Sequence, residues 1–137
     1  AYAARCRLQI ERRTISGESE AQVVSEIQDI LNRFATEDAT FQGTVKAFLS
    51  REPSEINPDT TMAKTLSQAY MDVLGCRPKY IGVAYWMDTA LLSAAGIETV
   101  TIGPIGAGAH AQVEWVEIQS LIDLAEILVN ASVSYCQ

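Results

Sequence analysis

A polar segment with two prolines, residues 52–61, is the feature that most constrains how this 137-residue chain can fold. Its sequence is Glu-Pro-Ser-Glu-Ile-Asn-Pro-Asp-Thr-Thr, a composition typical of a linker. Proline has no backbone N–H and does not fit inside a helix or a central strand. We therefore place a boundary near residue 56 and expect two structured parts, residues 1–55 and 56–137.

Residues 1–55 have the pattern strand–helix–strand. Apolar and polar residues alternate over residues 5–14 and again over 40–50, which is the period of a half-buried strand. Between them, Ser19 and Gln22 are a capping-box pair that opens a helix. That helix has one apolar stripe at three-to-four spacing: Val23, Val24, Ile27, Ile30, Leu31 and Phe34. Because two strands alone are marginally stable, we expect an open α+β sheet that needs more strands than this part supplies.

Residues 56–137 alternate helix and strand, which is typical of an α/β layer. We predict helices over residues 62–74, 87–95 and 117–133, and short strands over 80–84 and 98–102. In the last helix the spacing predicts this inward-facing stripe: Ile118, Leu121, Ile122, Ala125, Leu128 and Val129.

Composition excludes several classes of protein. The net charge of -7 argues against a nucleic-acid partner, because binding phosphates requires a basic face. No apolar run reaches the roughly 18 residues of a membrane span, and the first residues lack the pattern of a secretory signal. Cys6, Cys76 and Cys136 form no C-x-x-C pair, so we expect buried free thiols in a cytoplasmic protein.

The only histidine, His110, follows a glycine-rich run and precedes an acidic and aromatic segment, residues 114–116. A neutral imidazole is a common metal ligand, but a zinc site needs three or four protein ligands. His110 therefore either has a structural role or supplies one ligand to a site completed elsewhere. The glycines, including Gly106 and Gly108, either aim His110 at a metal and leave space for substrate, or form an ordinary flexible loop.

Three segments resemble motifs of one metallohydrolase family. Residues 8–18 (Leu-Gln-Ile-Glu-Arg-Arg-Thr-Ile-Ser-Gly-Glu) resemble its strand and turn D-x-R-x-x-P-G-E. Residues 87–97 (Met-Asp-Thr-Ala-Leu-Leu-Ser-Ala-Ala-Gly-Ile) resemble its T-D-A-x-x-L-x-x-x-G-I, and residues 103–116 resemble its closing G-P-G…A-H-x-x-D-E-[YW]-V. The family is the dinuclear-zinc amidohydrolases that include acetylornithine deacetylase, aminoacylase, succinyl-diaminopimelate desuccinylase and carboxypeptidase G.

The resemblance implies a fold for each part of the chain. Residues 1–55 resemble the second half of the family's small, open-sheet (ferredoxin-like) lid domain, which often mediates dimerisation. Residues 56–137 resemble the C-terminal α/β part of its catalytic domain. The resemblance therefore implies a homodimer formed through the lid strands, and an N-terminal remainder of the enzyme as a further partner.

The resemblance also implies a reaction, the hydrolysis of an N-acyl amino acid or a related amide. Two zinc ions, or cobalt, would polarise the amide carbonyl and activate a bridging water, with an upstream glutamate as general base. Of the family's metal ligands only His110 has a counterpart here, because the chain contains no H-x-D and no Glu-Glu. We therefore expect the chain alone to be inactive and to bind no zinc tightly, and we assign it no catalytic residue.

The chain departs from the family's motifs at three positions. Ser16 replaces the motif's proline, which could loosen the turn. Val113 replaces an acid and removes one charge near the metal loop, and Met87 replaces a threonine in a loop that helps to line the substrate pocket of relatives. The acyl group and the amino acid therefore stay open.

Arg12 and Arg13 stand at the end of the first predicted strand. A guanidinium suits bidentate recognition of a carboxylate. These two residues either contact a substrate carboxylate or the catalytic domain, or they are solvated or form ion pairs with Glu11 or Glu18.

Two acidic residues are candidates for positions near the metal. Asp88 either caps a short helix or lies close to the active site. Glu114 either hydrogen-bonds to groups beside the metal or is simply solvated.

A function of a different class also fits the chain, namely a non-catalytic α+β binding or dimerisation module that uses the edge of the first strand. If the chain is instead part of the hydrolase, surfaces that pack on other strands would be uncovered. We then expect an open sheet edge or an apolar patch near residues 80–102.

Overall fold

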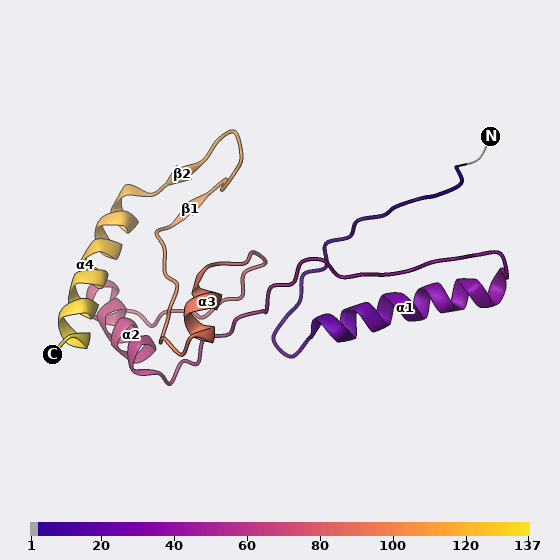
Figure 1. Ribbon diagram of the computed structural model, residues 1–137. Coiled ribbons are helices and arrows are strands. Elements are labelled where there is room, and N and C mark those ends of the chain that lie inside the picture. Colours follow the sequence, from indigo (N-terminus) through magenta and orange to yellow (C-terminus); the bar gives the residue numbers. More distant parts are fainter. Residues whose placement is uncertain (1–2) are drawn as a thin grey trace. The chain divides into compact units, whose positions relative to one another are not determined.

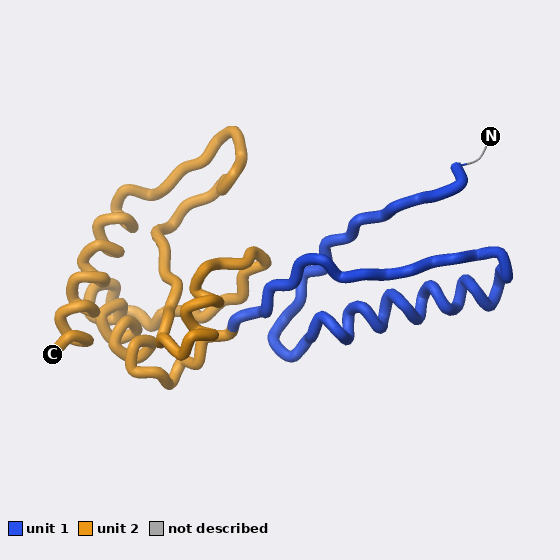
Figure 2. The backbone as a smooth tube through the Cα atoms, viewed as in Figure 1, with its two compact units in different colours: residues 1–54 blue, residues 55–137 orange. Residues whose placement is uncertain are grey.

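The computed structural model describes residues 3–137 and divides the chain into two compact units, residues 1–54 and 55–137 (Figure 2). The division falls inside the polar, proline-containing segment 52–61.

The first unit consists of one long helix, α1 (Glu20–Glu37), between two uncoiled segments (Figure 1). The Ser19 hydroxyl caps the helix by accepting the Gln22 N–H at 3.3 Å, which confirms this half of the predicted capping pair. The segment after the helix packs on it, since the rings of Phe34 and Phe41 have centroids 5.8 Å apart. Gly43 lies so close to α1 that an added Cβ would be 2.9 Å from Leu31 Cδ2.

The four predicted strands do not form. Among the described residues the only strands are β1 (Gly106–Ala107) and β2 (Trp115–Val116), and residues 5–14, 40–50, 80–84 and 98–102 belong to neither. The alternation is real, but a strand also needs a neighbour that takes up its backbone hydrogen bonds. Within residues 3–137 no such neighbour lies beside these segments.

The second unit has its core between two helices, α2 (Thr61–Leu74) and α4 (Ile118–Tyr135) (Figure 1). Thr60 caps α2 by accepting the Ala63 N–H at 3.3 Å, and Gly75 ends it in the left-handed conformation, with φ 68°. The core side chains are few and small, and they pack tightly because alanine lets the two backbones approach: Leu66, Ala69, Ile127 and Ala131.

The segment 98–102 lies along this helix pair. Val100 and Ile102 pack against the core while Thr101 between them is exposed, so one face of the segment is covered. The Glu98 carboxylate accepts the Met62 N–H at 2.8 Å, which satisfies a donor that the first turn of α2 otherwise leaves open. The segment is thus held at the N-terminus of α2 as well as by packing.

The predicted inward stripe of α4 is wrong. Its members are exposed, and the buried residues are Ile127 and Ala131. The helix is apolar over most of its circumference, so the spacing does not select the face that meets α2. Despite this apolar character, none of the helices in residues 3–137 is both long and apolar enough to cross a membrane.

The short helix α3 (Thr89–Ala94) is followed by Gly96 with φ 80°, near the end that the sequence predicts. The expectation of buried thiols is wrong, because Cys6, Cys76 and Cys136 are all exposed. Cys6 is in an uncoiled segment, Cys76 follows α2 and Cys136 is the C-cap of α4, so all three lie outside the α2–α4 core.

Ile127 and Ile122 offer a matched test of the core, since the first is 2% and the second 55% exposed on the same helix. We expect Ile127→Ala to lower the free energy of unfolding of the second unit by about 2–5 kcal/mol, because it removes packed methyl groups and leaves a cavity. Ile122→Ala should change it by less than about 0.5 kcal/mol. Urea unfolding followed by circular dichroism measures both, and equal losses would show that the core has been misplaced.

Candidate functional site

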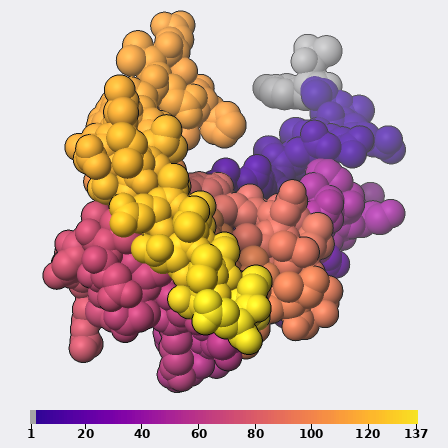
Figure 3. All heavy atoms as spheres, turned by 90° about the vertical axis from the view of Figure 1, so that its left-hand side faces the viewer, coloured from indigo at the N-terminus to yellow at the C-terminus, as the bar shows by residue number. Residues whose placement is uncertain are grey.

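The glycine-rich segment folds as a small antiparallel hairpin in which Gly106 pairs with Val116 and Ala107 with Trp115. Its loop, residues 108–114, carries His110. The hairpin (orange) stands out from the helices of its unit in both the ribbon and the space-filling views (Figures 1 and 3). The sequence predicted a glycine-dependent loop here but not its pairing.

Of the three glycines in residues 103–108, two are required by the close approach of the hairpin's two sides. A Cβ on Gly106 would lie 2.5 Å from the Trp115 carbonyl oxygen, well inside contact distance. Gly108 has φ 81°, and a Cβ there would overlap the Val113 carbonyl oxygen. Gly103, in contrast, has open space around it.

His110 lies in a tight turn at the far end of the hairpin. The Ala111 N–H donates to the Gly108 carbonyl oxygen at 2.8 Å, so His110 is the third residue of a four-residue turn. It has φ 64° and is the only residue other than glycine with a positive φ among residues 3–137. Type II turns take a positive φ at this third position, where glycine is unstrained and asparagine, aspartate and histidine are the side chains found most often. The residue is exposed, so its imidazole is accessible and not sealed in an apolar interior.

Residues 3–137 do not make a metal site by themselves. They contain no group of three or more histidine, cysteine, aspartate or glutamate side chains that could hold an ion. Glu114 and Asp88 are both exposed and do not join His110 in such a group. Zinc needs three or four protein ligands, so the role of His110 as one such ligand stays a prediction.

Asp88 occupies the N-cap position of α3 without capping it. Its backbone is already helical, with φ -60° and ψ -18°, and its side chain makes no cap hydrogen bond. A capping side chain acts from an extended backbone, which turns its oxygen toward the next N–H groups. The predicted side-chain cap is therefore wrong, while the position near an active site stays a prediction.

The guanidinium of Arg12 bridges two glutamates of the first unit. It donates to Glu18 at 2.6 Å and to Glu26 of α1 at 2.7 Å, and these bonds raise the pKa of Arg12. Arg13 pairs with Glu11 at 2.9 Å. The ion-pair interpretation of both arginines thus describes their geometry, and a role in substrate binding stays a prediction.

Glu18 also closes the turn formed by residues 15–18. Its carboxylate accepts the Ile15 N–H at 3.0 Å. This hydrogen bond, followed by the one from Arg12, holds the pKa of Glu18 below its ordinary value. The turn is thereby tied to the start of α1 through Arg12 and Glu26.

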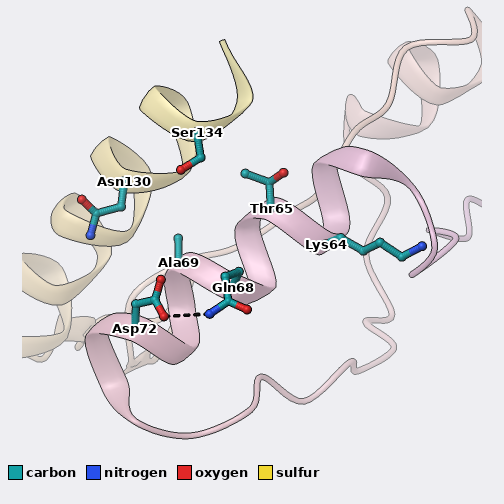
Figure 4. A pocket seen from close by; sticks show the side chains of 7 residues that line it. All are labelled: Lys64, Thr65, Gln68, Ala69, Asp72, Asn130 and Ser134. Carbon is teal, nitrogen blue, oxygen red and sulfur yellow. Dashed lines mark hydrogen bonds between the residues drawn. The ribbon is translucent and has the colours of Figure 1, made fainter. Parts of the chain in front are cut away.

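Two surface hollows of the second unit lie away from the hairpin. One, of about 380 Å³, lies between α2 and α4 and is lined mainly by polar side chains, among them Gln68 and Asn130 (Figure 4). The other, of about 230 Å³, lies between residues 55–60 and 93–99. Neither is lined by His110, Asp88 or Glu114, although the second includes Ser93, Gly96 and Ile97 from the motif segment 87–97.

The sequence profile of Peptidase family M20/M25/M40 matches residues 8–133. The chain belongs to this family. The matched range includes all three motif segments, and the broad family resemblance is confirmed. Members are generally metal-dependent hydrolases, so the chain is related to metallopeptidases and amidohydrolases. No curated protein and no solved structure is significantly similar to the chain.

The hairpin geometry makes Gly108→Ala and Gly103→Ala a matched pair. We expect Gly108→Ala to disrupt the hairpin, because alanine at a positive φ and against the Val113 carbonyl is strained by at least about 1 kcal/mol. Gly103→Ala should leave it intact. Amide resonances of residues 106–116 in ¹H–¹⁵N spectra distinguish the two, and a hairpin unchanged by Gly108→Ala would contradict this geometry.

The Glu18 contacts predict a pH dependence. A depressed folded pKa means that the contacts stabilise the turn fully above the ordinary value of 4.5 and are lost as the pH falls through the folded pKa below 4.5. We expect the Ile15 amide resonance to titrate with a midpoint below 4.5.

Arg12→Gln should raise that midpoint only part of the way, because the Ile15 N–H is the larger cause of the shift. Arg13→Gln is the control, since Arg13 bonds to Glu11, and should leave the midpoint unchanged. A midpoint at or above 4.5 in the unmodified chain would show that Glu18 does not close this turn.

Proposed function

We propose that this chain is the C-terminal part of a metal-dependent amidohydrolase that cleaves N-acyl amino acids or related amides, as acetylornithine deacetylase does. His110 would bind one of two zinc or cobalt ions. The chain alone is then inactive, and other polypeptide supplies the remaining ligands and the general base.

One observation carries the proposal. His110 is exposed at the end of a hairpin whose glycines are required by its geometry, and it stands at the histidine of a closing motif within a matched M20/M25/M40 segment. An exposed imidazole is accessible to a metal ion and is not part of the core of its unit, so its place in this turn is easier to explain as a ligand than as a structural residue.

Completion by other polypeptide is supported by the uncovered surface of the second unit. The face of α4 opposite to α2 is apolar and exposed, with Ile118 at 75% and Val129 at 61%. Exposed apolar side chains also gather along the sequence between residues 80 and 97, as expected near residues 80–102: Tyr80, Ile81, Val83, Tyr85, Trp86, Leu91, Leu92 and Ile97.

Exposed apolar side chains in such numbers are normally buried against another element or chain. The covering polypeptide would be the N-terminal remainder of the enzyme.

The remaining parts of the proposal concern the first unit and the setting. Residues 1–55 would be half of a ferredoxin-like lid, with segments 5–14 and 40–50 as strands of a sheet completed by the other half. The enzyme would be a cytoplasmic homodimer joined through lid strands, and Arg12 or Arg13 would meet the substrate carboxylate when the lid closes. Asp88 and Glu114 would act beside the metal.

A non-catalytic binding or dimerisation module is the second candidate. It is favoured by the lack of any three-ligand cluster in residues 3–137 and by the uncoiled segment 5–14, whose Leu8 is 78% exposed. Such a module would associate through this segment without metal.

The decisive experiment supplies the chain with an N-terminal polypeptide of the family that carries H-x-D and Glu-Glu. We expect two zinc ions per assembled enzyme and hydrolysis of a panel of N-acyl amino acids, measured by metal analysis and amine release. His110→Asn should lower kcat/KM by more than about 100-fold, because it removes a ligand while asparagine keeps the positive φ.

Gln112→Asn, an exposed change in the same loop, is the control and should keep full activity. Full activity of His110→Asn would exclude the metal-ligand role. Metal-free association of the chain without any hydrolysis would select the binding module.

A further inference from the structure

The base of the hairpin contains a rung of the ladder that is completed by a side chain. The register places Ile105 opposite Glu117, one pair beyond Gly106 and Val116. The Glu117 N–H donates to the Ile105 carbonyl oxygen at 2.8 Å. In a hydrogen-bonded antiparallel pair, a second bond would run directly from the Ile105 N–H to the Glu117 carbonyl oxygen.

Here the Ser120 hydroxyl takes the place of that second bond. The Ile105 N–H donates to Ser120 Oγ at 2.9 Å, and Ser120 Oγ donates to the Glu117 carbonyl oxygen at 2.8 Å. Both backbone polar groups of Ile105 are therefore bound to the start of α4. Ser120 lies in the first turn of that helix and is half-buried.

The hairpin has little else to fix its direction. Each of its strands has only two residues, and Ile105, Trp115 and Val116 are all exposed. Glu117, the N-cap of α4, makes no side-chain cap bond. The hydrogen bonds around Ile105 are thus the junction through which helix α4 controls how the hairpin is oriented.

We propose that Ser120 is a positioning residue for His110: its hydroxyl completes the last rung of the hairpin and fixes the hairpin on helix α4. This inference rests on the proposed function in one respect, that His110 is a metal ligand. A ligand must be held within about 0.5 Å of its productive place, and a small rotation at the base of a hairpin becomes a larger displacement at its far end. Loss of one hydroxyl at the base would therefore move or loosen the imidazole without touching it.

Three variants of the chain isolate this hydroxyl. Ser120→Ala removes it, and Ser120→Thr keeps an oxygen at the same place. The matched control is Ser132→Ala, because Ser132 is also on α4 and its hydroxyl donates to the Leu128 carbonyl oxygen at 2.7 Å, far along the helix from the hairpin. None of the three changes the amino acid at position 110.

The first measurement uses the chain itself. In Ser120→Ala we expect the Ile105 amide proton to exchange with solvent about three- to tenfold faster, which is the effect of losing one net hydrogen bond. We also expect residual dipolar couplings to show residues 106–116 reoriented or averaged relative to α4. Ser120→Thr should restore both values, and Ser132→Ala should leave both unchanged.

These outcomes decide the inference without any metal. If the Ile105 N–H and the Glu117 carbonyl close up into a direct bond in Ser120→Ala, exchange stays slow, the couplings stay fixed and the inference is wrong. The same holds if Ser132→Ala loosens the hairpin as much, because the effect would then be a general loss of helix stability.

The second measurement uses the enzyme assembled with its N-terminal polypeptide. Ser120→Ala should raise the zinc dissociation constant about 10- to 100-fold, and Ser120→Thr should restore it. A hairpin loosened by Ser120→Ala together with no effect of His110→Asn on zinc overturns the proposed function alone. A strong effect of His110→Asn together with none of Ser120→Ala overturns the positioning role alone.

Discussion

The packing of α2 on α4 is the interaction on which the rest of the second unit depends. Leu66 and Ala69 from one helix meet Ile127 and Ala131 from the other. Together with Ala63 of α2, these are the described residues most fully removed from water. Burial of this size contributes only a few kcal/mol, since each fully buried aliphatic side chain contributes about 1.5–3 kcal/mol. The helix pair then holds the segment 98–102 on one side and, through Ser120, the hairpin at its end.

The two sides of α4 have different surroundings. One side meets α2 through small residues. The other side keeps a continuous apolar surface exposed, and the segment 98–102 has one face covered and no strand beside it among the described residues. A helix that is apolar all round belongs inside a protein, not on its surface. The second unit therefore has the character of a layer, because one side of α4 packs on α2 and the other side is exposed.

The sequence predicts local structure well and pairing poorly. Ser19, Thr60 and Gly75 act within a few residues of themselves, so helix starts and ends follow from short-range chemistry. The buried face of α2 also follows from its sequence, because the polar residues Lys64, Gln68 and Asp72 mark the exposed side of the helix. On α4 no polar face is wide enough to select the inward side, so that prediction fails. Strands depend on a distant neighbour, and period-2 alternation does not say whether one is present.

The candidate site likewise has one part that the sequence predicts and one part that it does not. His110 can be singled out from the sequence, because it is the only imidazole and the segment around it resembles a motif of dinuclear-zinc amidohydrolases. Neither the hairpin nor the positioning role that we propose for Ser120 can be predicted from the sequence. The only sequence signal is a serine three residues beyond the N-cap of a helix. Its hydrogen bond to the Ile105 N–H depends on the register of the hairpin, because Ile105 lies fifteen residues upstream. A side chain that completes a backbone ladder leaves almost no compositional signal.

The geometry of the hairpin also explains why glycines precede the imidazole. Gly106 and Gly108 bring the two strands closer than side chains allow, and the chain must then reverse within the few residues that carry His110. The turn places the histidine at a positive φ, a conformation that costs about 1–3 kcal/mol when a side chain is present. Glycine would relieve the strain completely, so the conformation of the turn does not by itself require an imidazole at residue 110. The metal-ligand role that we propose would account for the histidine that is present.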